Sequence, residues 1–355
     1  MIDIAAFRLH NQQLTQQEFK NPGEVVGWMG AMQAQEYALA KWALGLRLPG
    51  LKDADIEQAF TDGSILRTHV MRPTWHFVTP ADIRWILALT APRVHALNAY
   101  MYRKLELDAE LLLRSNTVIA KTLEGGKQLT RAELALALGQ AGIVAEGMRL
   151  GYIVMNAELD AIICSGARRG KQFTWALLDE RAPQAITLTR DEALAELVKR
   201  FFSSHGPAMV HDFAWWSGLT IADTKAGLEM CKPQLMQEEI NGRMYWFSSS
   251  IPDAKSASGT AYLLPPYDEY GIGYKDHSAI LDPAHMEQIA DGSRTFTAFY
   301  AIQGQFAGMW KRTFNKGGVV IDTRPFRSLT PAENTAFAAA AQRFGEFLGM
   351  PVAQE

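Results

Sequence analysis

Signals for helix starts recur along the chain and constrain its fold more than any other feature. Each signal is a Thr whose hydroxyl can accept from an unpaired backbone N–H, with an Asp or Glu three residues later near the positive end of the helix. The signals begin at Thr15, Thr79, Thr130, Thr189, Thr220 and Thr330. Asn21-Pro22 adds a start with proline at the first helical position. The chain is therefore predicted to be mainly helical.

Short runs with strand character follow groups of these helices. The third run contains Asn241-Gly242, a strong signal for a two-residue hairpin turn. The predicted helices lie at 55–60, then at 130–140 and 145–159, then at 205–219 and 222–230, and the hairpins that follow them lie at 67–78, 164–178 and 231–247. Helices followed by a β-hairpin are the outline of a winged helix. We therefore predict an α+β fold, mainly helical, with three tandem winged-helix units.

The composition changes after the third hairpin, where alternating runs with Gly turns predict β-structure at 261–280 and 295–321. A last amphipathic helix is expected at 331–348, and Lys255–Gly259 is the best candidate for a linker. The expected division is a first unit over 1–115, a second over 116–185, a third over 186–254 and a C-terminal β-rich part over 255–355.

Composition narrows the classes of function. Hydrophobic residues make up 48% and charged residues 21% of the 355 residues, as in soluble globular proteins. No apolar run approaches the roughly 18 residues of a membrane helix, and no secretion signal is evident. Two cysteines, Cys164 and Cys231, fit a reducing cytoplasm and argue against a cysteine-built zinc site. The net charge of −3 counts against a dedicated nucleic-acid binder, although one basic face can lie on a neutral body.

The tripeptide Gln33-Ala34-Gln35 is the candidate catalytic element. A glutamine amide does not titrate, but it can hold a water molecule or an anion in place. The helix that starts at Asn21-Pro22 is expected to run to about Met32, and residues two apart on a helix point roughly 200° away from each other. The pair can therefore serve one site only if the helix ends there and the next segment is extended or kinked. The alternative is two solvated glutamines on an exposed helix face.

Basic residues gather on the predicted hairpins. The first hairpin carries Arg67, His69, Arg72, Trp75 and His76. Such a mixture can contact phosphates and stack on an unpaired base, or it can be a structural strand with its His and Trp packed inward. A second group, Arg168, Arg169 and Lys171, lies where a wing tip is expected, and Lys311 and Arg312 with Lys316 repeat the theme near the C-terminus. These groups are candidate phosphate contacts or charges that serve solubility.

Other chemistries have weaker support in the residues. His205, His211 and Asp212 lack a further ligand at a suitable spacing, so a core or capping role is expected instead of a metal site. Asp268-Glu269 is interpreted as a solvated turn, with a place in a cleft as the alternative. The sequence contains neither a GxSxG motif nor a P-loop, and we expect no metal and no cofactor.

Four segments in this order resemble the AlkZ/YcaQ-like winged-helix DNA glycosylases. They are Gln33-Ala34-Gln35, ILRTHVMRPTWHFVTPADIRW, HGPAMVHDFAWWSGL and AYLLPPYDEYGIGYKD, and the resemblance covers about residues 5–350. It implies three winged-helix motifs and a C-terminal β-rich part that form a C-shaped body around DNA. It also implies that Gln33 and Gln35 are catalytic, because Gln in the third place of the motif is similar to the AlkZ branch.

The resemblance implies hydrolysis of the N-glycosidic bond of N7-alkylated purines, with bulky adducts and interstrand crosslinks as candidate substrates. Alkylation at N7 makes the base cationic, so the leaving group needs no general acid. What remains is to position water and to stabilise an oxocarbenium-like sugar, which two amides can do without titrating. The expected partner is double-stranded DNA with alkylated bases, bound by a cytoplasmic monomer. The alternative is a non-catalytic winged-helix DNA-binding protein or regulator; a small-molecule hydrolase lacks a nucleophile motif.

Overall fold

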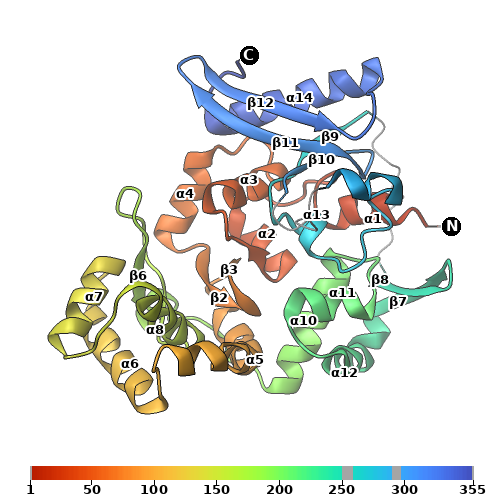
Figure 1. Ribbon diagram of the computed structural model, residues 1–355. Coiled ribbons are helices and arrows are strands. Elements are labelled where there is room, and N and C mark those ends of the chain that lie inside the picture. The colour runs from red at the N-terminus through yellow and green to blue at the C-terminus, as the bar shows by residue number, and fades with distance from the viewer. Residues whose placement is uncertain (1, 250–258, 290–296, 354–355) are drawn as a thin grey trace.

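The computed structural model describes residues 2–249, 259–289 and 297–353 (Figure 1). Helices and short antiparallel sheets make an α+β fold in which helix predominates. Among the described residues, one order of elements occurs three times: a helix, a short extended segment, two helices and a two-stranded hairpin. In each group the short segment pairs with the second strand of the hairpin.

The first group contains the glutamine tripeptide. Its elements are α2 (Pro22–Met29), β1 (Met32–Gln33), α3 (Tyr37–Arg47), α4 (Asp53–Asp62), β2 (Leu66–Val70) and β3 (Arg72–Val78). The helix α1 (Ile4–Asn11) precedes it. Asn21 caps α2 through its side chain, and Pro22 lies in the first turn, as expected. The sheet order β1-β3-β2 places the tripeptide beside the returning strand of the hairpin.

The second group follows a long helix, α5 (Ile83–Lys104), which contains Pro92. The elements of this group are α6 (Ala109–Leu123), β4 (Leu129–Thr130), α7 (Arg131–Gln140), α8 (Gly147–Leu159), β5 (Ile163–Ser165) and β6 (Thr174–Leu177), and the short α9 (Leu178–Arg181) ends it. The helix α6 runs across residue 115, where the first unit was expected to end, and packs against α7 and α8. It therefore goes with the second group.

The third group has the elements α10 (Arg190–Ser204), α11 (Val210–Ser217), α12 (Ile221–Cys231), the 3-10 turn η1 (Lys232–Gln234), β7 (Leu235–Ile240) and β8 (Arg243–Ser248). Its short extended segment is Ala208, which bridges to Trp246 of β8. Asn241 and Gly242 both have positive φ in the turn between β7 and β8, so the hairpin predicted from this pair is confirmed.

The C-terminal part is a four-stranded antiparallel sheet covered by one helix. Its elements are β9 (Ala261–Leu263), α13 (Glu269–Ile272), the 3-10 helix η2 (Pro283–Gln288), β10 (Phe299–Ile302), β11 (Gln305–Asn315), β12 (Gly318–Pro325) and α14 (Pro331–Leu348), with strand order β12-β11-β10-β9. The expectation of β-structure throughout 261–280 was wrong. Only residues 261–263 form a strand, because Pro265-Pro266 interrupts the run and Asp268 then caps the short α13.

The helix-start signals are confirmed at Thr130, Thr189, Thr220 and Thr330, where each hydroxyl and the acidic residue three positions later form a capping box. The signal at Thr15 was wrong, and residues 15–20 are not helical. The backbone N–H of Glu18, which a cap at Thr15 would need, donates instead to the side-chain oxygen of Gln13 at 3.0 Å. The expected linker residues 255–258 lie outside the described residues.

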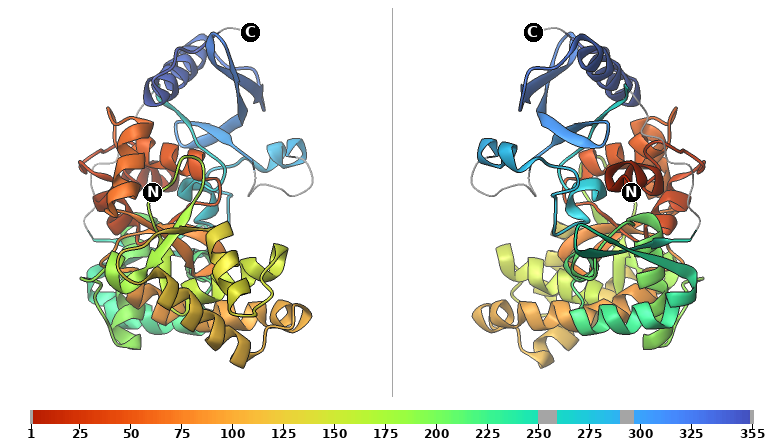
Figure 2. Two further views of the ribbon diagram at one scale, coloured as in Figure 1. Left: turned by 90° about the vertical axis from the view of Figure 1, so that its left-hand side faces the viewer. Right: turned by 90° about the vertical axis from the view of Figure 1, so that its right-hand side faces the viewer.

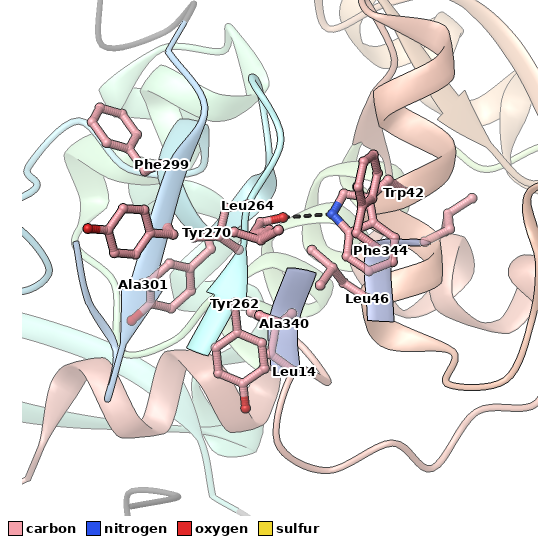
Figure 3. Close-up of a cluster of buried hydrophobic side chains, with 14 of the residues drawn as sticks. Leu14, Trp42, Leu46, Tyr262, Leu264, Tyr270, Phe299, Ala301, Ala340 and Phe344 are labelled. Atoms are coloured by element: carbon pink, nitrogen blue, oxygen red, sulfur yellow. Dashed lines mark hydrogen bonds between the residues drawn. The ribbon is translucent and has the colours of Figure 1, made fainter. Parts of the chain in front are cut away.

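Two large shared cores join these groups, a small cluster joins α5 to α8, and the second group adds a core of its own. One core combines α2–α4 with the C-terminal sheet and α14, where Trp42 packs against Phe344 and donates from its indole to the carbonyl oxygen of Leu263 at 2.7 Å (Figure 3). A second core joins β2, β3 and α5 to the third group. The strand β2 also contacts β5 and α8 of the second group. The first group therefore lies at the centre and contacts all the others (Figures 1 and 2). Within the described ranges, no helix is long and apolar enough to cross a membrane.

Candidate active site

The helix before the glutamine tripeptide ends early, and this places both glutamines outside it. Helix α2 stops at Met29, three residues before the expected end, because Gly30 adopts a positive φ of 79°. Met32 and Gln33 are extended and pair with Phe77 and His76 of β3. The requirement derived from helix geometry, that the helix must break before the pair, is met.

Gln33 is almost enclosed, with an exposed fraction of 5%, and it is held at two points. Its backbone N–H donates to Oε1 of Glu269 at 2.7 Å, and its side-chain oxygen accepts from Nη2 of Arg72 at 2.7 Å. A guanidinium can only donate, so the amide oxygen of Gln33 must face Arg72 and its NH₂ group must face away.

Gln35 is held more loosely and is partly exposed. Its side-chain oxygen accepts from the backbone N–H of Trp75 at 3.4 Å, a long hydrogen bond. The residue between the glutamines is anchored better: the N–H of Ala34 donates to the carbonyl oxygen of Trp75 at 2.7 Å. The tripeptide thus has an anchored backbone, one side chain held by a short hydrogen bond and one held by a long one.

Glu269 is a buried carboxylate, 1% exposed, behind Gln33. Besides the Gln33 N–H, it accepts from the indole N–H of Trp216 at 2.9 Å and lies 3.3 Å from Nε2 of His205. Burial raises the pKa of Glu269, but the hydrogen bonds from His205 and from the Gln33 N–H and the charge of Arg72 outweigh it, so the pKa is lowered overall. The carboxylate is therefore charged at neutral pH.

Arg67 supports the tripeptide from another side. Its Nε donates to the carbonyl oxygen of Ala34 at 3.0 Å, and its guanidinium carbon lies 4.3 Å from the Trp75 ring centroid and 4.5 Å from that of Phe173. Burial lowers the pKa of Arg67 to about 10, which leaves it charged. Phe173 ends the second hairpin loop, so this loop contacts Arg67, the residue that supports the tripeptide.

The two histidines of the first hairpin are buried. His69 pairs through Nδ1 with Glu158, which also accepts from the indole of Trp175 at 2.7 Å. His76 is fully buried, and its Nδ1 lies 3.0 Å from the carbonyl oxygen of Thr74. Burial, and then the charge of Arg72, hold the pKa of His76 well below its usual value, so the ring is neutral. Arg67, His69 and His76 thus face protein and not solvent.

The other basic candidates are more accessible. Arg169 and Lys171 are exposed in the second hairpin loop, although Arg169 also pairs with Glu133 at 2.8 Å. Arg168 is half-buried and pairs with Glu57 at 3.3 Å. On β11, Lys311 is exposed and lies 3.5 Å from Asp322, whereas Arg312 packs over the rings of Phe314 and Phe344.

The expected core and capping roles of the third-group candidates are confirmed for two residues. His205 is fully buried, and Asp212 accepts from the backbone N–H of Met209 at 2.8 Å and of Lys275 at 2.9 Å. His211 is exposed. Within the described ranges, no group of three or more His, Cys, Asp or Glu residues is arranged to hold a metal ion.

Sequence reasoning missed the buried acidic pair. Asp268-Glu269 was interpreted as a solvated turn, and this was wrong, since both side chains are at most 3% exposed. Asp268 forms a bidentate ion pair with Arg47 of α3, and both N–O distances are 3.0 Å. Arg47 and Gln33 lie more than 200 residues away along the chain, so no local pattern reveals these partners. The one available signal was the acidic pair itself, set among aromatic residues and glycines.

Comparison with known proteins identifies the class of this chain. The model of the family "DNA glycosylase AlkZ-like" matches residues 26–347. An interstrand DNA cross-link repair glycosylase of Streptomyces sahachiroi is 24% identical over 324 residues, which cover 87% of this chain and 86% of that protein. The structure of the DNA glycosylase AlkZ of the same organism superimposes with a TM-score of 0.81 at 21% identity, over 99% of this chain and 98% of that one.

The protein is therefore a DNA glycosylase, an enzyme that hydrolyses N-glycosidic bonds. It belongs to the AlkZ-like DNA glycosylase family. This membership confirms the resemblance inferred from the glutamine tripeptide and the three further segments.

Proposed function

We propose that this glycosylase releases N7-alkylated purines from double-stranded DNA, including bulky adducts and interstrand crosslinks, with Gln33 and Gln35 as its catalytic residues. The observation that supports this most is the extended segment after α2, on which two non-titrating amides lie within a charged, buried frame. The name of the Streptomyces relative, a cross-link repair glycosylase, favours the crosslink as a substrate.

The chemistry fits an amide pair. N7-alkylation gives the base a positive charge, so it leaves without a proton from a general acid. The enzyme then has to orient water towards C1′ and to accommodate the positive charge that develops on the sugar. An amide oxygen has two lone pairs, so the oxygen of Gln33 can accept from water while Arg72 holds it. The partly exposed Gln35 provides the second amide oxygen.

Release of 7-methylguanine and unhooking of a nitrogen-mustard crosslink test this proposal. We expect Gln33→Ala and Gln35→Ala each to lower the single-turnover rate by about 10²-fold or more, the scale seen when one oriented polar group is removed from an active site. Gln342→Ala, on the exposed face of α14, is the matched control and should keep the full rate. If the double variant stays fully active, the assignment of the glutamines is wrong. If the wild type binds DNA but releases no N7-alkylated base, the substrate class is wrong.

We further propose that the three groups are winged-helix units of a monomer that forms a C-shaped body around DNA, with the boundary between the first and second units just before α6. Of the basic candidates, the exposed Arg169, Lys171 and Lys311 are the best placed to contact phosphates. Arg168 and Arg312, which are partly exposed, are the second choice. Trp75, which is partly exposed, is a candidate to stack on a base. The buried Arg67, His69 and His76 support the hairpin instead.

Salt dependence tests the phosphate contacts. A lysine that neutralises one phosphate contributes about one to the slope of log affinity against log salt concentration. We expect Lys171→Ala and Lys311→Ala each to weaken DNA binding and to lower this slope by about one. Lys225→Ala, in α12, is a control of equal charge change. Equal losses in all three variants would indicate a general charge effect and not local contacts.

A further inference from the structure

Gln33 lies between two opposite charges, the buried carboxylate of Glu269 and the partly buried guanidinium of Arg72, and neither residue contacts the substrate in the chemistry described so far. Glu269 holds its backbone and Arg72 holds its side chain, both at 2.7 Å. This distance is typical of hydrogen bonds in which one partner is ionised, which are stronger and more directional than neutral ones. The amide of Gln33 therefore has one preferred orientation.

Both anchors are fixed by consecutive residues of α11. The backbone carbonyl oxygen of Trp215 accepts from Nη1 of Arg72 at 3.2 Å, and the indole of Trp216 donates to Oε2 of Glu269 at 2.9 Å. A helix holds two neighbouring residues in a rigid relative geometry. The third group thus sets the distance between the anchors, although neither glutamine belongs to it.

Arg72 is also restrained at its own backbone. It follows Met71, whose positive φ of 63° makes the tight turn of the first hairpin. Met71 is fully buried, and its N–H donates to the hydroxyl of Thr90 at 3.1 Å. The tip of this hairpin is therefore buried against α5, unlike an exposed wing tip, and the root of the Arg72 side chain cannot shift freely.

We propose that Arg72 is a positioning residue for the glycosylase reaction, and not a DNA-binding residue as the basic pattern of the hairpin suggested. It locks the amide oxygen of Gln33 in place, with Glu269 as the counter-anchor on the backbone. This inference rests on the proposed catalytic role of Gln33. It assigns Gln33 as the pre-oriented member of the pair and leaves Gln35 as the member that adjusts to substrate.

A double-mutant cycle between Arg72 and Gln33 tests this, with the single-turnover rate and the DNA affinity measured separately on a duplex with one 7-methylguanine. We expect Arg72→Met to lower the rate constant about 10- to 100-fold, the range for loss of orientation. The Kd for the duplex and its salt slope should stay within about twofold of wild type. In the Gln33→Ala background, Arg72→Met should have no further effect on the rate, because it acts through Gln33.

Arg72→Lys separates positioning from folding. Lysine keeps one charged donor for the Gln33 oxygen but cannot also reach the Trp215 carbonyl in the planar guanidinium geometry. We expect it to recover part of the rate lost in Arg72→Met, while both variants unfold at similar temperatures. If Arg72→Met does not fold, Arg72→Lys replaces it in the double-mutant cycle. Arg72→Lys should then lower the rate when Gln33 is present, but should not lower it further in the Gln33→Ala variant.

Several outcomes would overturn the inference. One is a weaker Kd with a salt slope lower by about one and an unchanged rate at saturating enzyme, which indicates a phosphate contact. Another is additive losses in the cycle, which indicate an independent role for Arg72. If Gln33→Ala is inactive while Arg72→Met has the wild-type rate, only this inference fails. If Gln33→Ala is fully active, the proposed function fails and this inference fails with it.

Discussion

Two buried titratable residues, His76 and Glu269, lie next to Gln33. Their pKa values differ from those of exposed histidine and glutamate side chains. His76 lies opposite Gln33 in the sheet, and Glu269 accepts from its backbone. The pKa of His76 is held well below its usual value by burial and by the charge of Arg72. The neighbourhood of the tripeptide is thus built for one protonation state, with neutral His76 and charged Glu269.

His76 should make the stability of the protein dependent on pH. In the unfolded chain this histidine binds a proton below about pH 6.5, whereas in the folded protein it stays neutral to much lower pH. The unfolded state therefore binds more protons, and the free energy of unfolding should fall as the pH falls below about 6.5, by up to about 1.4 kcal/mol per pH unit.

Urea denaturation of wild type and His76→Gln at pH 7.5 and pH 5 measures this term. The loss of stability between the two pH values should be smaller in the variant, with a remainder from His205, whose pKa burial also lowers. His211→Gln changes an exposed histidine and serves as control. An equal loss in wild type and His76→Gln would show that His76 does not contribute.

At the scale of single elements, the end of α11 makes a close backbone contact with the first hairpin. Gly218 caps this helix with a φ of 72°, and a Cβ at this position would lie 2.4 Å from the carbonyl oxygen of Met71. The end of α11 therefore contacts the turn that precedes Arg72. A glycine in the third group thereby helps to place a side chain of the first group.

Gly218→Ala should destabilise the protein and also slow the reaction. We expect a loss of about 1–3 kcal/mol in the free energy of unfolding, from the strained φ and from the overlap with Met71, and a lower single-turnover rate because the turn before Arg72 must move. Gly242→Ala is the matched control, since it has a similar φ of 74° but no atom within 4 Å. If both variants lose equal stability and keep equal rates, the contact with Met71 has no influence on the site.

On the scale of the whole molecule, the first group connects segments that lie far apart in the chain. Its core continues into the C-terminal sheet on one side and into the third group on the other. The ion pair between Arg47 and Asp268 crosses the first of these junctions with both side chains at most 2% exposed. This ion pair fixes the segment that places Glu269 beside Gln33.

Asp268→Asn should be strongly destabilising. Removal of one partner leaves the Arg47 charge buried without a counter-charge, which typically costs about 3–5 kcal/mol. Thermal and urea unfolding measure the loss. Asp322→Asn breaks the pair with the exposed Lys311, which lies at the surface, and should change stability by less than about 1 kcal/mol. A similar small change in Asp268→Asn would mean that the junction does not depend on this pair.

Local interactions were the part of the structure that sequence reasoning predicted well. The capping boxes at Thr130, Thr189, Thr220 and Thr330 and the turn at Asn241-Gly242 involve groups within a few residues of each other, so the pattern and the structure agree. The recurring order of helices and hairpins follows from these signals. The tripeptide was recognised from its own residues and from the three further segments that follow it in the chain.

The surroundings of the tripeptide were decided by tertiary structure alone. The burial of Asp268 and Glu269 depends on Arg47, Trp216 and the Gln33 backbone, which are distant in sequence. Arg67, His69 and His76 have the composition of a nucleic-acid contact, but the neighbouring groups enclose them. A charged side chain is stable inside a protein only beside a compensating partner, and the fold alone brings these partners together. The sequence by itself therefore determined most of the elements and the candidate catalytic pair, whereas the tertiary structure decided which charges hold Gln33.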